Sequence, residues 1–189
     1  MKKARISEFR LLALAILILI ISYYFDNRVS FFFKGIDSFV LKTIFSIAAN
    51  IGIIFVLVIA LPSILLYKRS KRLARLLWLT AFVSFILAFI LKIIILRQRP
   101  ENVLTFPFTH IIDYSFPSMH AMIVFSILPL LVEAFSRYKY LWITFAFAAA
   151  FSRIYFRFHF LSDVVFGAFA GYFIGDWLLY LHKRGKLWK

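Results

Sequence analysis

Three short polar stretches interrupt a chain that is otherwise strongly apolar. Their side chains are of the kinds needed to bind a phosphoryl group, to attack it and to protonate the group that leaves. The residues concerned are Lys92, Arg99, Ser118, His120, Ser152, Arg153, His159 and Asp163. Ionisable side chains are costly within a bilayer and usually mark function where they occur there. The combination therefore predicts a site that handles phosphate.

The first stretch, KIIILRQRP, occupies residues 92–100. Lys92 and Arg99 are two helical turns apart, so a helix would place both on one face near its end. Pro100 then prevents the helix from continuing. Arg97 lies off this face, and we expect it to be a surface cation. A pair of cations that reach toward the lipid headgroups explains Lys92 and Arg99 equally well.

The second stretch, Pro117-Ser118-Met119-His120, has the form of a helix start. Ser118 is a favourable N-cap residue, and His120 follows in the first turn. The free N–H groups and the dipole at a helix N-terminus attract anions such as phosphate. Ser118 and His120 are therefore candidates for contact with a bound phosphate, although a lone histidine at a helix start is more often structural.

The third stretch pairs His159 with Asp163 at helical spacing. The carboxylate can accept a hydrogen bond from the imidazole Nδ1–H, which fixes the tautomer and leaves Nε2 free to attack. We expect this pair at a solvent-accessible helix start, with Ser152 and Arg153 at the end of the preceding helix. Histidine and aspartate four residues apart also occur at helix starts without any catalytic role.

A metal site is a competing interpretation of the same residues. Two histidines and one aspartate could hold a metal ion that compensates the charge of a phosphate. The three cations Lys92, Arg99 and Arg153 could provide this compensation themselves. The sequence therefore favours a site without a metal.

The composition indicates an integral membrane protein. The chain has 189 residues, of which 63% are hydrophobic, and its mean hydropathy is +0.91, whereas a soluble domain is nearer half apolar. The net charge of +15 could suggest nucleic acid. Most basic residues flank apolar segments, however, so an anionic lipid bilayer is the expected partner, and nucleic acid is not. Cysteine is absent, which excludes disulfides and thiolate chemistry.

Six apolar stretches can cross a bilayer as helices, which needs about 20 residues each. They lie at 9–24, 44–66, 76–96, 119–135, 140–155 and 161–181. The expected fold is therefore all-α with six transmembrane helices in one domain over residues 1–189. Residues 25–43 are too polar to span and too apolar to float free, so we expect a short interfacial helix there. No small-x-small cleavage site follows Ile21, so we expect an uncleaved first span.

Basic residues are distributed unevenly between the two sides of these spans. Most of the 23 lysines and arginines fall at the termini and in the connections after the second and fourth spans. The side with this excess is expected to face the cytoplasm. We therefore expect a multi-pass protein of the inner (cytoplasmic) membrane, with both termini in the cytoplasm and all three polar stretches facing the periplasm or the outside.

The three polar stretches resemble the motifs of the type-2 phosphatidic acid phosphatase superfamily of membrane lipid phosphatases. The family pattern is K-x6-R-P, P-S-G-H and S-R-x5-H-x3-D, and residues 92–100, 117–120 and 152–163 match it in order and in spacing. The one departure is Met119, where the family has glycine. A glycine lets the backbone approach the phosphate, so Met119 is expected to alter the local geometry and narrow the pocket.

The resemblance implies a role for each residue. His159 would be the nucleophile that forms a phosphohistidine, Asp163 its orienting group, and His120 the general acid for the leaving group. The phosphoryl oxygens would be bound by Lys92, Arg99, Arg153 and Ser118, with Ser152 and Met119 as candidate helpers. Members of the family work without a metal, so no cofactor is expected. Of the two histidines, only His159 has a carboxylate at helical spacing, which agrees with the implied nucleophile.

The sequence thus predicts a metal-independent phosphatase or pyrophosphatase that acts on a membrane lipid at the outer face of the membrane. Polyprenyl pyrophosphate, lipid A 1-phosphate and phosphatidylglycerol phosphate are three bacterial candidates, which the sequence does not rank. One alternative is a lipid phosphotransferase that uses the same phosphohistidine. Another is a non-catalytic lipid-phosphate binder or transporter, for which the cations alone would suffice. No obligate protein partner is indicated.

The loop at residues 101–116 is long for a connection and is expected to shape the headgroup pocket. It contains Phe106, Phe108, His110 and Asp113. We interpret His110 as a solvated loop residue and not as a catalyst.

Overall fold

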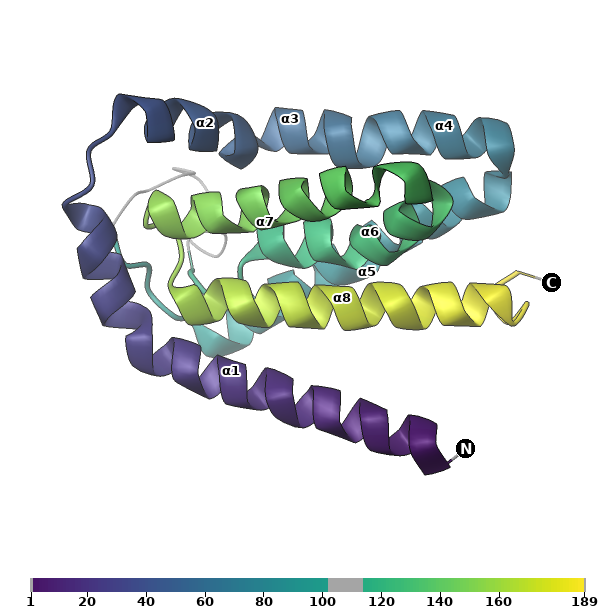
Figure 1. The fold of residues 1–189 in the computed structure, drawn as a ribbon, viewed down its shortest axis with the longest axis horizontal. Helices are drawn as coiled ribbons and strands as arrows, with labels where there is room; N and C mark the ends of the chain where they lie inside the picture. Colours follow the sequence, from purple (N-terminus) through teal and green to yellow (C-terminus); the bar gives the residue numbers. More distant parts are fainter. Residues whose placement is uncertain (1, 102–113, 189) are drawn as a thin grey trace.

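The chain folds into a bundle of helices. The structure is a computed structural model that describes residues 2–101 and 114–188, with side chains in the first range from residue 13 onward. All regular elements in these ranges are helical. In chain order they are α1 (Lys2–Lys34), α2 (Phe39–Ala49), α3 (Ile51–Ile54), η1 (Phe55–Ala60), α4 (Leu61–Arg69), α5 (Lys71–Ile95), α6 (Met119–Ala134), η2 (Ser136–Tyr138), α7 (Lys139–Tyr155) and α8 (Leu161–Lys183) (Figure 1).

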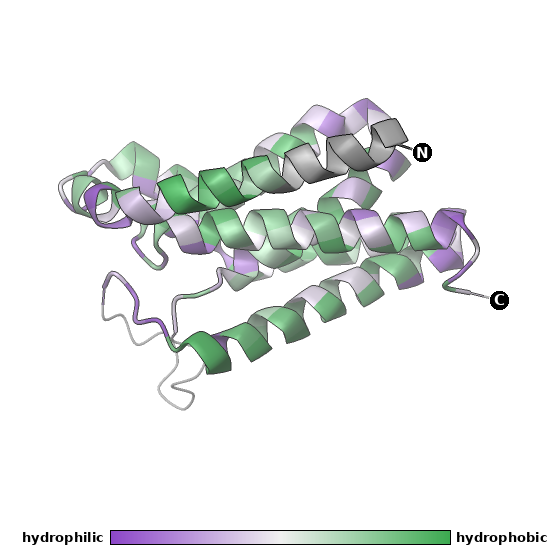
Figure 2. Cartoon of the chain, turned by 90° about the horizontal axis from the view of Figure 1, so that it is seen from below, coloured by the Kyte–Doolittle hydropathy of each residue, from purple (hydrophilic) through white to green (hydrophobic). Residues whose placement is uncertain are grey.

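The lengths and the apolar character of the helices fit a membrane. Four segments of the described chain are long and apolar enough to cross one: Ala13–Lys34, Ile51–Arg69, Lys71–Ile95 and Leu161–Lys183. Helices α6 and α7 have 16 and 17 residues, so each is about 24–26 Å long, slightly less than a hydrocarbon core of about 30 Å. Hydrophilic residues are concentrated at the two ends of the bundle (Figure 2). The predicted all-α membrane fold is confirmed, and the number of six spans stays a prediction.

The separate interfacial helix predicted for residues 25–43 is not found. Helix α1 runs without interruption to Lys34, and α2 begins at Phe39. Two polar residues in the last turns of α1, Asp26 and Ser30, are turned inward and are only 3% and 9% exposed. Ser30 Oγ accepts a hydrogen bond from Arg157 Nε at 3.4 Å. These side chains therefore contact the rest of the protein and not the headgroups.

The region of the second predicted span is divided into α2, α3, η1 and α4, which follow one another nearly in line (Figure 1). Asn50 interrupts the helix with an extended backbone, and its Oδ1 accepts a hydrogen bond from Ile53 N–H at 3.1 Å. The segment η1 is π-helical, and Leu61 N–H bonds to the Val56 carbonyl five residues earlier. Pro62 follows. Since proline has no N–H and its ring clashes with the preceding turn, a wider turn is favoured there.

Helix α6 packs against α5, α7 and α8, and its contact with α8 is unusually close. Three glycines on α8 face α6: Gly167, Gly171 and Gly175. A Cβ atom on Gly175 would lie 1.9 Å from the Ser126 carbonyl oxygen, so no larger residue fits there unless the helices move apart. Small residues at this spacing allow membrane helices to approach closely. The contact fixes the start of α6 against the start of α8, where Ser118 N–H donates to the Asp163 carbonyl at 3.1 Å.

The polar stretches meet at one end of the bundle. The C-terminal ends of α5 and α7 and the N-terminal ends of α6 and α8 lie at the left of Figure 1, whereas both chain termini lie at the opposite end. The row from α2 to α4 runs opposite to α1 and α5, and α5, α6, α7 and α8 alternate in direction, so connections that are distant in sequence come together (Figure 1). The residues singled out in the sequence therefore gather at this end.

Candidate active site

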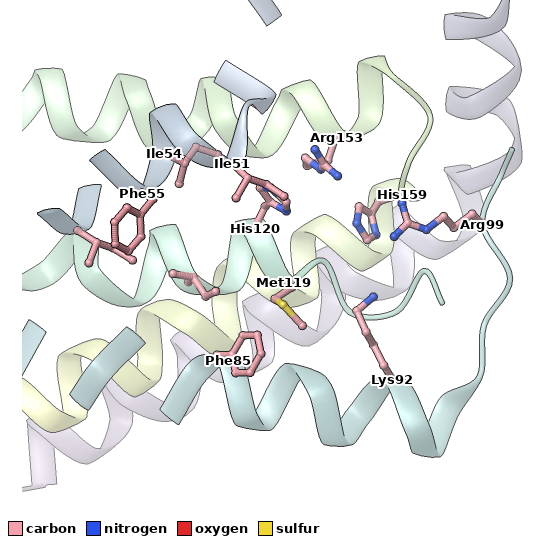
Figure 3. Close-up of a pocket in the computed structure, with 12 residues that line it drawn as sticks. Ile51, Ile54, Phe55, Phe85, Lys92, Arg99, Met119, His120, Arg153 and His159 are labelled. Carbon is pink, nitrogen blue, oxygen red and sulfur yellow. The ribbon is translucent and has the colours of Figure 1, made fainter. Parts of the chain in front are cut away.

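A cavity of about 440 Å³ lies beside the α3–η1 segment, and its lining falls into two groups (Figure 3). The apolar group consists of Ile51, Ile54, Phe55, Ile59, Phe85 and Ile123. The basic group consists of Lys92, Arg99, His120, Arg153 and His159. Met119 lies between the two groups in the close-up view. One cavity thus joins an apolar wall to a concentration of cations and imidazoles.

Lys92 and Arg99 reach this cavity in a way that helical spacing did not predict. Lys92 lies in the last turn of α5, is 1% exposed, and its Nζ donates to the Tyr114 carbonyl. Helix α5 ends at Ile95. Leu96 adopts a left-handed conformation, and its N–H donates to the Lys92 carbonyl at 3.1 Å. The expected helical face shared by Lys92 and Arg99 is therefore wrong, because the helix ends before Arg99. Both residues nevertheless line the cavity.

Arg153 comes from the last turn of α7 and is directed toward the cavity (Figure 3). It is 6% exposed, and its guanidinium lies 4.6 Å from the centroid of the Phe158 ring. Its Nε has no hydrogen-bond partner among the residues that the structure describes. A buried guanidinium with an unused donor is well suited to bind an anion.

The candidate helper Ser152, next to Arg153, does not line the cavity. Its hydroxyl donates to the Ala149 carbonyl of its own helix at 2.7 Å. The described contacts of Ser152 are therefore structural.

The start of α6 brings His120 into the cavity and leaves Ser118 outside its lining. Ser118 occupies the N-cap position, as predicted, but its side chain makes no capping hydrogen bond. The hydroxyl is fully buried and has no partner within the described ranges. Met119 and His120, in the first turn, both line the cavity.

His159 lies in the short loop between α7 and α8, and its ring is directed toward the cavity (Figure 3). The ring Nδ1 is 2.6 Å from the Ser115 carbonyl oxygen. Because a carbonyl can only accept, Nδ1 must carry the proton, and Nε2 keeps its lone pair. The N–H groups of Phe158 and His159 both donate to the Arg153 carbonyl, at 3.1 and 3.2 Å. The loop is thus fixed, and Nε2 is the atom available to a ligand.

The electrostatic surroundings keep His159 neutral. Burial lowers the pKa of its imidazole well below the ordinary value, and the neighbouring cations Arg153, Lys92 and Arg99 lower it further. The residue therefore retains a free lone pair at physiological pH. A nucleophilic role requires this state.

Asp163 does not bond to His159 directly, as the spacing predicted. Its Oδ2 is 3.9 Å from Nδ1, too far for a hydrogen bond. The same oxygen accepts from the Ser115 hydroxyl and from Phe160 N–H at 2.8 Å. Ser115 therefore connects the two residues, with its hydroxyl on the carboxylate and its carbonyl on the imidazole. Asp163 is also 0% exposed, which corrects the expected solvent-accessible position.

Arg97 is not the surface cation that we expected. Its terminal nitrogens lie 2.7 Å from Asp26 Oδ2 and 2.7 Å from Asp163 Oδ1, and its guanidinium lies 4.2 Å from the centroid of the Phe160 ring. Burial disfavours the charged guanidinium, but the two carboxylates outweigh this and raise the pKa of Arg97 above its ordinary value. Since the helix ends before Arg97, helical periodicity does not determine where its side chain points.

Sequence reasoning missed three residues of this site: Asp26, Arg97 and Ser115. A lone carboxylate at the end of an apolar stretch is itself a signal of function, and this signal could have identified Asp26. Ser115 carries no comparable signal, because its contacts depend on the folded course of a loop. Most of that loop, residues 102–113 with Phe106, Phe108, His110 and Asp113, lies outside the described residues.

The fold and the cavity define a multi-pass helical membrane protein with a basic pocket that contains two histidines. Residues 72–186 match the family model described as the PAP2 superfamily. The match covers more than half of the chain and includes all three polar stretches. The chain therefore belongs to the PAP2 superfamily, and the resemblance inferred from the motifs is confirmed.

The fold is similar to that of a solved structure, described as the first transmembrane PAP2 type phosphatidylglycerolphosphate phosphatase from Bacillus subtilis. The TM-score is 0.69 at 20% sequence identity, and the similarity covers 94% of this chain and 98% of that chain. At this identity the likeness establishes the fold. A comparison with curated proteins gave no match.

Proposed function

We propose that the protein is a phosphatase that removes a phosphate from a membrane lipid through a phosphohistidine formed on His159. The observation that carries this proposal is the cavity that joins an apolar wall to three cations and two histidines. A lipid phosphate has the same two parts, an apolar body and an anionic head. Membership of the PAP2 superfamily and the fold of a PAP2-type phosphatase support this class of activity.

In the first step, His159 Nε2 attacks the phosphorus atom of the bound lipid. A P–N bond forms while the P–O bond to the lipid breaks, and His120 gives its proton to the departing oxygen. Lys92, Arg99 and Arg153 stabilise the charge on the phosphoryl oxygens during the transfer. Ser118, two residues before His120, does not line the cavity. We assign it a supporting role at the N-cap position of α6 and no contact with the phosphoryl oxygens.

In the second step, water attacks the phosphohistidine and the P–N bond breaks. The proton of the water passes to His120, which restores both histidines, and phosphate leaves. A lipid hydroxyl in place of water would make the protein a phosphotransferase. Release of inorganic phosphate distinguishes the two reactions.

The cations make a metal ion unnecessary for this chemistry. Three positive side chains around one phosphoryl group supply the charge compensation that a divalent ion supplies in other phosphatases. The reaction is therefore proposed to be metal-independent, and to take place on the side of the membrane opposite the basic termini.

The apolar half of the cavity favours a substrate that arrives from the bilayer. Phosphatidylglycerol phosphate is the first lipid to test, because the structurally similar protein is described as acting on it. Lipid A 1-phosphate and a polyprenyl pyrophosphate also join an apolar body to a phosphorylated head, and they are the other two lipids to test.

The test is a phosphate-release assay on these three lipids with the purified full-length protein. We expect release from at least one of them, loss of release in His159→Ala, and a radiolabelled phosphoryl group trapped on the parent protein by rapid quenching in base. The absence of phosphate release together with tight lipid binding would indicate a non-catalytic binder. Transfer of the label to a second lipid would indicate a phosphotransferase.

The same assay tests the role of a metal. Activity should persist in excess chelator, and vanadate, a mimic of five-coordinate phosphorus, should inhibit. Activity that disappears in chelator and returns only with a divalent ion would contradict the proposed role of the three cations.

A further inference from the structure

Asp26 is a buried carboxylate on α1, outside the residues 72–186 that match the superfamily. It is 3% exposed and belongs to Ala13–Lys34, a segment apolar enough to cross a membrane. A carboxylate in such a place is costly unless it is paired. Its partners therefore indicate what it does.

The partners of Asp26 lie at the start of α8 and in the loop after α5. Its Oδ2 accepts hydrogen bonds from Arg97 Nη2 at 2.7 Å and from the Ser162 hydroxyl at 2.5 Å. Its Oδ1 accepts from the Ser162 backbone N–H at 2.8 Å. That N–H is one of the first-turn donors that a helix cannot satisfy itself. Asp26 therefore caps a helix that begins far along the chain.

Arg97 extends this contact to the carboxylate of Asp163. Its Nη1 donates to Asp163 Oδ1 at 2.7 Å and to the Ser162 hydroxyl at 2.8 Å. Arg97 does not line the cavity that contains the histidines, and its terminal nitrogens are bonded to the two aspartates and to Ser162. The guanidinium therefore fixes Asp26 and Asp163 relative to each other.

Asp163 in turn reaches His159 through Ser115. The Ser115 hydroxyl donates to Asp163 Oδ2, and the Ser115 carbonyl accepts from His159 Nδ1–H at 2.6 Å. A continuous series of polar contacts therefore leads from α1 to the nucleophile. Its members, in order, are Asp26, Arg97, Asp163, Ser115 and His159.

We propose that Asp26 is a positioning residue for the phosphoryl transfer, acting through Arg97 and Asp163 on His159. This inference rests on the proposed function, in which His159 attacks the phosphorus atom. Asp26 does not line the cavity, so it contributes to the direction of the nucleophile and not to substrate binding. A misplacement of reacting groups by about 1 Å can cost about 10²-fold in rate. The change should therefore appear in kcat and not in KM.

The test uses the full-length protein and the lipid that it hydrolyses best. The variants are Asp26→Asn, Arg97→Gln and the double variant. Asparagine keeps the shape of Asp26 but presents an N–H donor to groups that are themselves donors. We expect kcat per folded molecule to fall about tenfold or more in Asp26→Asn, with KM within about twofold of the parent value. The double variant should lose much less than the product of the two single losses, because both residues act through one series of contacts.

Two further variants control for folding and for charge. Asp37 is an exposed acidic residue just beyond the end of α1, paired with Lys42 at 2.6 Å, and Asp37→Asn should keep the parent kcat. Ser162→Ala removes the hydroxyl that contacts both Asp26 and Arg97 and leaves every charge in place. Ser162→Ala should lower kcat by a smaller factor, about three- to tenfold. If Asp26→Asn does not fold, the result for Ser162→Ala decides the test.

Size-exclusion profiles and thermal midpoints on the same samples give the folded fraction. The inference is overturned if kcat per folded molecule stays within about twofold of the parent in the folded variants, or if the single losses multiply in the double variant. A parent protein that releases no phosphate from any lipid overturns the proposed function itself, and the role of Asp26 with it. The parent assay precedes the variants, so the two failures are distinguishable.

Discussion

The two histidines that line the cavity differ in their contacts with the rest of the protein. His159 has its Nδ1 fixed on the Ser115 carbonyl, which leaves Nε2 as a lone-pair donor aimed into the cavity. His120 sits in the first turn of α6, close to the free N–H groups of the helix start. This difference agrees with a nucleophile held in place on His159. A helix start and the adjacent cations disfavour a proton on His120, so its role as an acid requires the negative charge of a bound phosphate.

The first prediction concerns His120. His120→Ala should lower kcat by about 10²–10⁴-fold on a lipid phosphomonoester, because the departing alkoxide needs a proton. The loss should be smaller on a polyprenyl pyrophosphate, whose leaving group is already a stable phosphate. Parallel kinetics on the two lipids measure the difference. Equal losses on both would contradict a role in protonating the leaving group.

The second prediction concerns the charge of His159. Burial and the adjacent cations lower its pKa, so the folded protein should keep this imidazole neutral below pH 6.5, where an ordinary histidine gains a proton. At pH 6 an ordinary histidine is about three-quarters protonated. Exchange of the imidazole C2 hydrogen, followed by mass spectrometry without substrate, reports the midpoint. The denatured chain is the control and should titrate near pH 6.5, and a folded midpoint at or above that value would disprove the prediction.

The third prediction concerns Asp163. Asp163→Asn removes the negative charge between Arg97 and Ser115 and should lower turnover by several decades, as the comparable change does in a serine-protease triad, where it costs about 10⁴-fold. It should also destabilise the protein, because breaking a buried ion pair costs about 3–5 kcal/mol. Turnover and thermal midpoint should be measured on one detergent-solubilised sample. A less stable variant that hydrolyses lipid at the parent rate would show that Asp163 is only a helix cap.

At the scale of secondary structure, the ends of helices and not their interiors build the site. Lys92 and Arg153 lie in last turns, His120 in a first turn, and His159 in a five-residue connection between α7 and α8. These helix ends can meet at one site only if neighbouring helices keep a fixed position along one another, that is, a fixed register. The glycine contact between α6 and α8 provides this register, since it allows the two backbones to meet near Ser126.

This arrangement predicts that Gly175→Ala destabilises the protein by about 1–3 kcal/mol, a typical cost of overpacking. The added Cβ would lie 1.9 Å from the Ser126 carbonyl oxygen, and backbone atoms cannot swing aside as a side chain can. Gly35→Ala is the matched control, because its Cβ would lie 3.9 Å from the nearest atom. Thermal unfolding in detergent compares the two. A control that loses as much stability as Gly175→Ala would show that helix contact is not the cause.

Across the complete bundle, hydropathy and motif spacing predicted the all-α membrane fold and five residues that converge on the cavity. Lys92, Arg99, His120, Arg153 and His159 all line it. The contacts behind the cavity could not be predicted in this way. Asp26 and Ser162 are 136 positions apart, and neither helical periodicity nor a motif connects residues at that separation.

The same limit explains the wrong interpretation of Arg97 and of Asp163. Arg97 was expected at the surface because it lies off the helical face of Lys92 and Arg99, and Asp163 was expected there because it lies at a helix start. In the folded protein the Arg97 guanidinium lies 2.7 Å from an oxygen of Asp26 and 2.7 Å from an oxygen of Asp163. The opposite charges therefore compensate one another. Burial of this kind requires a partner from another helix. The packing of α1 against α8 brings Asp26 close to Asp163, and the loop after α5 places Arg97 between the two carboxylates.

The distribution of charge along the bundle gives the last prediction, which concerns orientation. Most of the basic residues lie at the end of the bundle that has the first turns of α1, the α4–α5 and α6–α7 connections and the end of α8. They are Lys2, Lys3, Arg5, Arg10, Lys68, Arg69, Lys71, Arg72, Arg75, Arg137, Lys139, Lys183, Arg184 and Lys186. The positive-inside rule therefore places that end in the cytoplasm and the cavity outside.

The chain contains no cysteine, so single cysteines can report this orientation without background. Gly35→Cys marks the connection between α1 and α2 at the cavity end, and Ser136→Cys marks η2 at the basic end; both positions are exposed. A membrane-impermeant maleimide should label only Gly35→Cys in intact spheroplasts and should label both after lysis, because the bilayer shields the cytoplasmic side. Labelling of Ser136→Cys alone in intact spheroplasts would reverse the orientation and would place the phosphate-binding cavity on the cytoplasmic face.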